Sequence, residues 1–292
     1  MARRRPPNTH GLAVVDKPSG VTSHDVVAMV RRRFDERQVG HAGTLDPDAT
    51  GVLLVGVGRC TRLLRFLTDL GKTYTGQVVF GTTTDSLDST GVVTGTFDLP
   101  GLTPAMVQSA VNAHLVGDIL QIPPMVSAVR VDGRRLHELA REGIEIERAP
   151  RPVTVHRFDV SPTPDPLVYD IAVHCSKGTY IRTLADDLGQ LCGGGAHLRG
   201  LRRVAVGGFQ VATAAAPDVV ELLSLPEAVR DYPRVTVDEA TAGLVRNGRV
   251  LARFDGPGPW AVLDPGGELL AMYEAFGADA AKPAVVVAAP VG

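Results

Sequence analysis

The sequence predicts an α+β protein with a large N-terminal domain on a mixed, largely antiparallel sheet, followed by a small, mostly β domain. The first observation is that strand-like and helix-like patterns alternate without the strict βαβ repeat of a parallel sheet. The second is composition, since 44% of the 292 residues are hydrophobic and only 5% aromatic, which suits a large core of Val, Leu and Ala. The third is a change near residue 210, after which small residues and short, glycine- and proline-broken strands dominate.

The first seventy residues carry the patterns of two strands and two helices. Gly11–Asp16 is a short apolar run of the kind found in buried strands. Thr22 or Ser23 can cap the first helix, which ends in three arginines whose charge suits a helix C-terminus. The elements expected after the first strand are a helix with Val26, Val27, Val30 and Phe34 on its apolar face, a glycine-rich loop from Gly40 to Gly51, a strand at Val52–Val57 and a helix with Leu63, Leu64 and Leu67 on one side.

Between residues 73 and 210, strands and helices flank a basic segment. Thr103 and Pro104 form a favourable cap and first-turn pair for a helix. Residues 121–151 are basic and proline-flanked, which predicts an inserted arm. The other expected elements are a strand at Tyr74–Phe80, a helix through Met106, Val107, Ala110 and Val111, a strand at Leu167–Cys175 and a helix at Thr179–Leu191.

The last eighty residues predict a linker and a small domain. Ala212–Pro217 is linker-like, and Val219–Leu225 predicts a short apolar helix. From about Val235 a helix precedes short strands, in a stretch of about 55 residues that is marginal for folding unless it packs against the first domain. The expected organisation is a tail at 1–9, a main domain at 10–210 with its insert at about 121–151, a linker and short helix at 211–234 and a small domain at 235–292.

Charge and cysteine content narrow the classes of function. The formal net charge of −2 by itself predicts no polyanionic partner, but basic residues gather in separate blocks, and residues 73–125 contain no lysine or arginine. If folding joins the blocks they form a nucleic-acid footprint, and otherwise they are solvated surface charge. No apolar run is long enough to span a bilayer, so we expect no membrane partner. Cys60, Cys175 and Cys192 lack CxxC spacing, so we expect neither a disulfide framework nor a zinc finger, and a cytoplasmic location.

The densest local signal is the glycine-rich loop Gly40-His-Ala-Gly-Thr-Leu-Asp-Pro-Asp-Ala-Thr-Gly51. Its glycines allow unusual backbone shapes, and Pro47 stiffens the chain after Asp46, so that carboxylate is presented from a tight loop. Asp46 could be a catalytic carboxylate or an ordinary turn residue. Paired with Asp48 it could serve a glycoside hydrolase, although the single tryptophan argues against a sugar platform. No phosphate-loop spacing is present, and His10, His24 and His41 have no metal-ligand pattern.

Several segments, in order over roughly residues 10–210, resemble the TruB family of bacterial tRNA pseudouridine synthases. That family isomerises the T-loop uridine at tRNA position 55. The matching segments are Asp16-Lys-Pro-Ser-Gly-Val-Thr-Ser23, Gly40-His-Ala-Gly-Thr-Leu-Asp-Pro47, Lys72-Thr-Tyr74, Thr84-Asp85, Gln121-Ile-Pro-Pro-Met-Val-Ser-Ala-Val-Arg130, Gly178-Thr-Tyr-Ile-Arg-Thr-Leu-Ala185 and His197-Leu-Arg-Gly-Leu-Arg-Arg203.

The resemblance implies a role for each candidate residue in the uridine site. Asp46 matches the catalytic aspartate, and Arg182 matches the arginine that pairs with it. Tyr74 matches the tyrosine that stacks on the target uracil, while Tyr180 and Leu201 match residues lining the uridine pocket. His41 matches the family histidine beside the active loop, where an imidazole can fill the space that the extruded base leaves or stack in the opened loop. The reaction needs no redox change or group donor, so no cofactor and no metal are expected.

The resemblance also implies an RNA partner, the T stem-loop of tRNA. Cations for phosphates are expected from Lys17, Arg59, Arg62, Arg130 and Arg141. The 121–151 arm resembles the RNA-clamping insert of the family, with His137 where the family often has an aromatic residue. The segment after 210 resembles the PUA-like C-terminal domain loosely and is acidic here. A monomer is expected, and an RNA chaperone, alone or as an additional role, is the alternative from another class.

Overall fold

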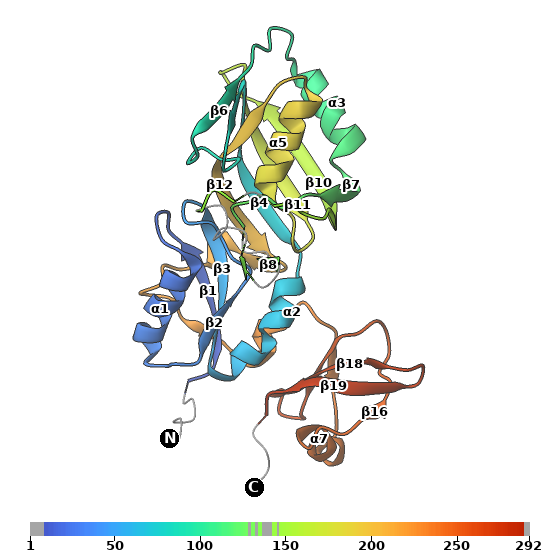
Figure 1. Ribbon diagram of the computed structural model, residues 1–292. Coiled ribbons are helices and arrows are strands. Elements are labelled where there is room, and N and C mark those ends of the chain that lie inside the picture. The colour runs from blue at the N-terminus through green and yellow to red at the C-terminus, as the bar shows by residue number, and fades with distance from the viewer. Residues whose placement is uncertain (1–8, 128–129, 132–133, 136–141, 145, 289–292) are drawn as a thin grey trace. The chain divides into compact units, whose positions relative to one another are not determined.

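The computed structural model describes residues 9–127, 130, 131, 134, 135, 142–144 and 146–288, and Figure 1 shows its helices and strands. Contacts within the chain divide it into two compact units. The first unit consists of Met1–Leu70 and Ala205–Gly292, and the second consists of Gly71–Val204.

The first unit is built on an antiparallel sheet with both faces buried. Strand β1 (Gly11–Lys17) pairs with β3 (Thr50–Val57) and with β14 (Leu222–Leu223), and β3 also pairs with β2 (Val39–Ala42). Alternate side chains of β1 and β3 enter two different cores, which explains why both strands are continuous apolar runs in the sequence. One core joins Ala13, Val15, Leu53 and Val55 to Val26, Val27 and Val30, and the other joins Leu12, Val14, Val52 and Leu54 to Leu63, Phe66 and Leu67.

Helix α1 (Ser23–Phe34) has strong signals at both ends. Of the two predicted caps, Thr22 is the one used: its hydroxyl accepts from Asp25 N–H, and its own N–H donates to Asp25 at 2.8 Å. The Thr22 hydroxyl also donates to the Asp25 carboxylate at 2.7 Å, and this bond, together with the one from the Thr22 N–H, lowers the pKa of the Asp25 carboxyl. At the other end, Arg33 donates to the backbone carbonyls of Asp218, Val219 and Val220. The helix is therefore tied to the chain that follows residue 210.

One predicted helix in the first unit is wrong. Val219–Leu225 is a turn followed by the short strand β14, in which Leu222 and Leu223 pair with Ala13 and Leu12 of β1. Pairing with β1 partly buries the side chains of Leu222 and Leu223, so the long-range contact overrides the local apolar pattern. A helix begins only at α6 (Leu225–Ala228), where the Ser224 hydroxyl accepts from Glu227 N–H.

The C-terminal part of the first unit is a curled β-domain with one helix. Its five-stranded sheet has the order β15-β17-β18-β19-β16, with β15 and β17 parallel and the other pairs antiparallel. Ala261, Leu269 and Met272 share a core with Phe66 and Leu67, which provides the support that so small a domain needs. Its elements are β15 (Arg234–Thr236), α7 (Glu239–Arg246), β16 (Leu251–Ala252), β17 (Trp260–Leu263), β18 (Leu269–Phe276) and β19 (Ala280–Val286).

The second unit is a sheet in the order β12-β4-β11-β10-β7, with antiparallel pairing from β4 to β7. Helix α3 (Pro104–His114) packs against β10 and against α5 (Ile181–Leu191), as Figure 1 shows. The strands are β4 (Lys72–Phe80), β7 (Gly117–Gln121), β10 (Arg151–Pro162), β11 (Val168–Cys175) and β12 (Ala196–Val206), and two hairpins are formed by β5 (Thr82–Thr84) with β6 (Val93–Thr96) and by β8 (Arg130–Val131) with β9 (Arg134–Arg135).

The remaining elements are short connections in the first unit. A 3₁₀ turn precedes the second predicted helix, and the predicted loop at 40–51 is shorter than expected because β2 and β3 take its two ends. The short elements are η1 (Gly58–Leu63), α2 (Leu64–Asp69), β13 (Phe209–Gln210) and η2 (Val211–Thr213).

Candidate active site

Asp46 lies in the first unit, on the loop at 43–49 between β2 and β3. Gly43 and Gly51 flank this loop with φ of 79° and 103°, values that favour glycine. The hydroxyl of Ser23 accepts from the Leu45 N–H at 3.0 Å and donates to the Leu45 carbonyl at 3.1 Å. Asp46 itself is half-buried. The sequence therefore folds into a stiff loop that leaves this carboxyl group partly accessible.

Lys17 fastens the same loop from beneath. Its side chain is fully buried, and its ammonium donates to the carbonyls of Pro47 at 2.7 Å, Ala49 at 2.7 Å and Pro18 at 2.8 Å. A buried ammonium is tolerated when its protons have acceptors, and these bonds supply them. This arrangement does not support the predicted phosphate contact of Lys17. We therefore correct that prediction and assign Lys17 to holding the Asp46 loop.

His41 lies on β2, opposite Val55 of β3, and is half-buried. The ring of His24, from the first turn of α1, meets it edge to face, with centroids 5.4 Å apart and planes at 83°. This geometry is a favourable one for aromatic rings. The first unit thus brings the His41 ring and the Asp46 loop together as neighbours of the same strand pair, β2 and β3.

Arg182 lies in the second unit, in the first turn of α5, and is only 4% exposed. Its guanidinium donates to the carbonyls of Ser86 and Val126, each at 2.8 Å. Its Nε is 3.6 Å from a carboxylate oxygen of Asp88. The charge is therefore buried, neutralised and held in one orientation by two different segments.

Asp88 is a residue that the sequence analysis missed. Its other carboxylate oxygen accepts from the hydroxyls of Ser86 at 2.7 Å and Thr90 at 2.6 Å, and from the Thr90 N–H at 3.0 Å. The turn therefore fixes the carboxylate that faces Arg182. The available signal was charge: residues 73–125 have four aspartates and no lysine or arginine, so any cation that pairs with one of them comes from elsewhere in the chain.

The predicted pocket residues of the second unit lie on β4, β12 and the start of α5. Tyr74 is on β4 opposite Val173 and is 8% exposed. Leu201 lies on β12 beside Gly76 of β4, two residues from Tyr74. Tyr180 is the N-cap residue of α5, two residues before Arg182. The second unit thus supplies four of the predicted site residues from adjoining elements: Tyr74, Tyr180, Arg182 and Leu201.

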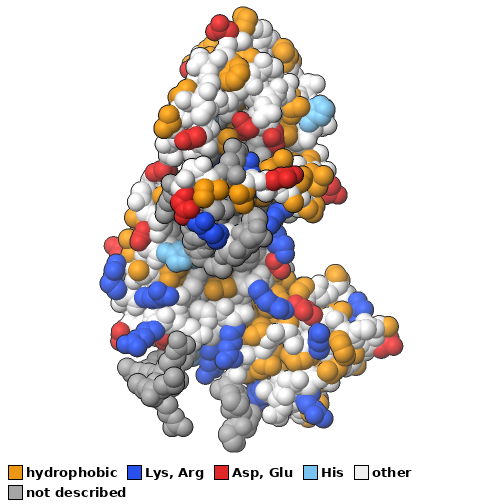
Figure 2. Space-filling view, in the orientation of Figure 1, with side chains coloured by type: hydrophobic (Ala, Val, Ile, Leu, Met, Phe, Trp, Pro, Cys, Tyr) orange, Lys and Arg blue, Asp and Glu red, His pale blue; other side chains and the backbone are white. Residues whose placement is uncertain are grey.

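The predicted phosphate contacts have varied surroundings. Arg59 is half-buried, and exposed Arg62 donates to the carbonyl of Val286 at 2.9 Å. The backbone of Arg130 belongs to β8, opposite Arg135. Arg141 and His137 lie outside the described residues. On the face shown in Figure 2, lysine and arginine side chains lie among hydrophobic and acidic ones, with few in the uppermost part of the view.

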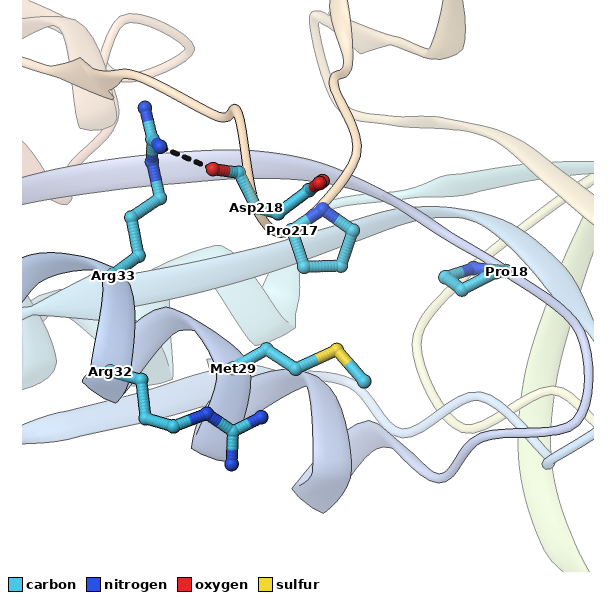
Figure 3. Close-up of a pocket in the computed structure, with 6 residues that line it drawn as sticks. All are labelled: Pro18, Met29, Arg32, Arg33, Pro217 and Asp218. Atoms are coloured by element: carbon cyan, nitrogen blue, oxygen red, sulfur yellow. Dashed lines mark hydrogen bonds between the residues drawn. The ribbon is translucent and has the colours of Figure 1, made fainter.

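A shallow cavity of about 460 Å³ lies elsewhere, against α1 in the first unit. Figure 3 shows Arg33 spanning it to the backbone of Asp218, beside Pro217. None of the predicted site residues lines this cavity. Within the described part of the chain, no three His, Cys, Asp or Glu side chains form a group that could hold a metal ion, and no helix is long and apolar enough to cross a membrane.

Comparisons with known proteins identify the family. Residues 31–181 match the TruB family pseudouridylate synthase N-terminal domain, 182–238 the tRNA pseudouridylate synthase B C-terminal domain, and 232–288 the domain described as tRNA pseudouridine synthase II, C terminal. The chain is 44% identical to a tRNA pseudouridine synthase B of Mycobacteroides abscessus, over 90% of this chain and 91% of that one. It is 45% identical to one of Streptomyces coelicolor, over 90% and 93%. The chain therefore belongs to the TruB family of pseudouridylate synthases.

The fold has relatives among solved structures. A crystal structure of a Cbf5–Nop10–Gar1 complex matches with a TM-score of 0.72 at 24% identity, covering 95% of this chain and 85% of that one. The structure of an H/ACA RNP bound to a substrate RNA containing 2′-deoxyuridine matches with a TM-score of 0.71 at 21% identity, covering 96% and 86%. The predicted fold class, α+β with a largely antiparallel sheet and a PUA-like C-terminal domain, is confirmed.

Proposed function

We propose that this chain isomerises uridine to pseudouridine at position 55, in the T loop of tRNA, with Asp46 as the catalytic residue. The observation that carries the proposal is the Asp46 loop, whose backbone is fixed by Lys17 and Ser23 while the carboxyl group remains partly accessible. A reacting group held in this way can act without first being ordered, which is a large part of enzymatic rate enhancement. Curated relatives named tRNA pseudouridine synthase B, at 44–48% identity, support tRNA as the substrate.

The reaction balances without an external reactant. The bond between N1 and C1′ breaks, the base turns, and a bond from C5 to C1′ forms, while C5 loses a proton and N1 gains one. The Asp46 carboxylate attacks C1′ or C6, or assists elimination, and all three routes belong to the proposal. Each of these routes uses an ionised, oriented carboxylate.

In this proposal, Arg182 pairs with Asp46 and so keeps the carboxylate ionised and oriented. A guanidinium beside a carboxylate favours its charged form and sets its orientation. Tyr74 then stacks on the uracil, with Tyr180 and Leu201 lining the pocket.

Base extrusion makes the target uridine reachable, and we assign His41 to the space that the base leaves. Its ring is supported from the side by His24, so it presents a firm surface to RNA. Arg59, Arg62, Arg130 and Arg141 contact phosphates, and affinity for tRNA therefore falls as salt rises. We also propose that the protein acts as a monomer in the cytoplasm.

The test is to map pseudouridine in an unmodified tRNA transcript after incubation with the chain. The proposal predicts a single pseudouridine at position 55 and none in a transcript that carries cytidine there. Pseudouridine at another position, or in the cytidine transcript, would contradict the specificity. An RNA chaperone without catalysis predicts refolded tRNA with no pseudouridine.

A further inference from the structure

At the base of the 121–151 insert, the side chain of Gln121 is hydrogen-bonded to the start of α5. Gln121 is the last residue of β7 and is only 1% exposed. Its amide nitrogen donates to the Tyr180 carbonyl at 3.2 Å, and its amide oxygen accepts from the Tyr180 N–H at 2.9 Å. A single buried amide therefore satisfies both backbone groups of a residue 59 positions away.

Tyr180 needs such a partner because of its place in the helix. As the N-cap of α5 it has extended backbone angles, φ −99° and ψ 109°, and its side chain makes no capping hydrogen bond. Its carbonyl already accepts the first helical bond, from Leu184 at 3.2 Å. The Gln121 amide bonds the peptide groups on both sides of the Tyr180 Cα atom, and the ring leaves the backbone in a direction set by those groups.

The same segment also reaches Arg182. Five residues after Gln121, the Val126 carbonyl accepts from the Arg182 guanidinium at 2.8 Å. The chain from 121 to 126 thus contacts the N-terminal turn of α5 at two of the residues assigned to the uridine site. If the Gln121 amide served only to satisfy its own buried polar atoms, its partners would not have to belong to a residue of the uridine site.

We propose that Gln121 is a positioning residue for the reaction: it fixes the Tyr180 backbone and thereby aims the Tyr180 ring at the target uridine. The inference rests on the proposed function. Gln121 contacts no reacting atom in this account and acts only through Tyr180. Because small displacements of pocket groups slow enzymatic reactions steeply, its loss should reduce turnover more than binding.

The experiment compares Gln121→Met with the wild type, using single-turnover tritium release from tRNA labelled at uridine C5 and a separate measurement of tRNA binding. Methionine has similar length but neither donor nor acceptor. We expect turnover to fall about tenfold while the Kd for tRNA changes less than threefold. Gln190→Met, the same change on the exposed side of α5, is the control and should leave turnover unchanged.

A double-mutant cycle separates positioning from general destabilisation. In a Tyr180→Ala background, Gln121→Met should have little further effect, because the ring that it aims is gone. An undiminished effect in that background would overturn the inference, as would full turnover by Gln121→Met in the otherwise native chain. Thermal unfolding of each variant is recorded so that rates are compared only where the chains are folded.

Gln121→Glu keeps the inference testable if the methionine variant does not fold. A protonated glutamate can both donate to the Tyr180 carbonyl and accept from its N–H, whereas an ionised one can only accept. Its turnover relative to wild type should therefore rise as pH falls, and a pH-independent ratio would contradict the inference. If the wild type itself releases no tritium, the proposed function fails instead, so the two failures are distinguishable.

Discussion

At the scale of single residues, the contacts of Lys17 assign it to stability rather than to RNA. Replacing it with methionine leaves the carbonyls of Pro18, Pro47 and Ala49 without their buried donor. We expect Lys17→Met to lower the free energy of unfolding by about 2–3 kcal/mol. Thermal or urea unfolding measures this, with Lys282→Met, on the exposed side of β19, as the control. If Lys17→Met is as stable as the wild type but binds tRNA more weakly and with less dependence on salt, Lys17 contacts a phosphate after all.

Asp88 carries the second prediction at this scale. Asp88→Asn keeps the size of the side chain but removes the charge facing Arg182. We expect turnover to fall by about tenfold or more, because the buried guanidinium loses a partner that neutralises and orients it, while tRNA affinity changes little. Asp85→Asn is the matched control, since Asp85 in the same turn accepts from the Val92 N–H. Equal effects of the two variants would show that the turn, rather than the ion pair, matters.

These residues also mark how far the sequence predicts the site. The Asp46 loop could be predicted because proline restricts the backbone and glycine permits positive φ, and the flanking Gly43 and Gly51 do adopt positive φ. Lys17 was misassigned because a lysine beside a loop gives no sign of which carbonyls surround it. Asp88 was missed because an ion pair between residues 94 positions apart depends on tertiary contacts.

At the scale of elements, α5 carries an acid whose titration affects stability. Burial raises the pKa of Asp187 to about 6, and neighbouring Asp186 adds to the rise. A folded-state pKa above the unfolded value favours folding at low pH, and this contribution is lost as pH rises through about 6. Asp187→Asn should therefore raise Tm relative to wild type at pH 7.5 and show a smaller difference at pH 4.5. The exposed Asp98→Asn serves as control, and a difference that grows toward low pH would contradict the sign.

The elements themselves were predictable wherever their signals are local. Thr22 caps α1 and Thr103 caps α3, as their sequences predict. The prediction of a helix at Val219–Leu225 was wrong because a short apolar run does not reveal that two of its residues pair with β1 as a strand. Periodicity identifies a helix with a buried stripe, but it does not reveal an edge strand of two residues.

At the scale of the whole molecule, the small C-terminal domain depends on the core that it shares with α2. Phe66 and Met272 belong to that core, and Trp260, the single tryptophan, is fully buried within the C-terminal domain. Phe66→Ala should therefore lower the free energy of unfolding of the C-terminal domain by about 3 kcal/mol, although Phe66 itself lies on α2. The fluorescence of Trp260 follows the unfolding of that domain, so its unfolding midpoint should shift. Leu244→Ala, at an exposed position of α7, is the control. An unchanged tryptophan transition in Phe66→Ala would mean that the C-terminal domain unfolds independently.

We propose that one carboxylate, that of Asp46, presented by a rigid loop, performs the isomerisation. Single-turnover release of C5 tritium from labelled tRNA by Asp46→Asn tests it most directly, with Asp48→Asn, an exposed neighbour in the same loop, as the matched control. We expect no release by Asp46→Asn above background, near-native tRNA binding by that variant, and near-native release by Asp48→Asn. Substantial release by Asp46→Asn, or equal loss in both variants, would contradict it.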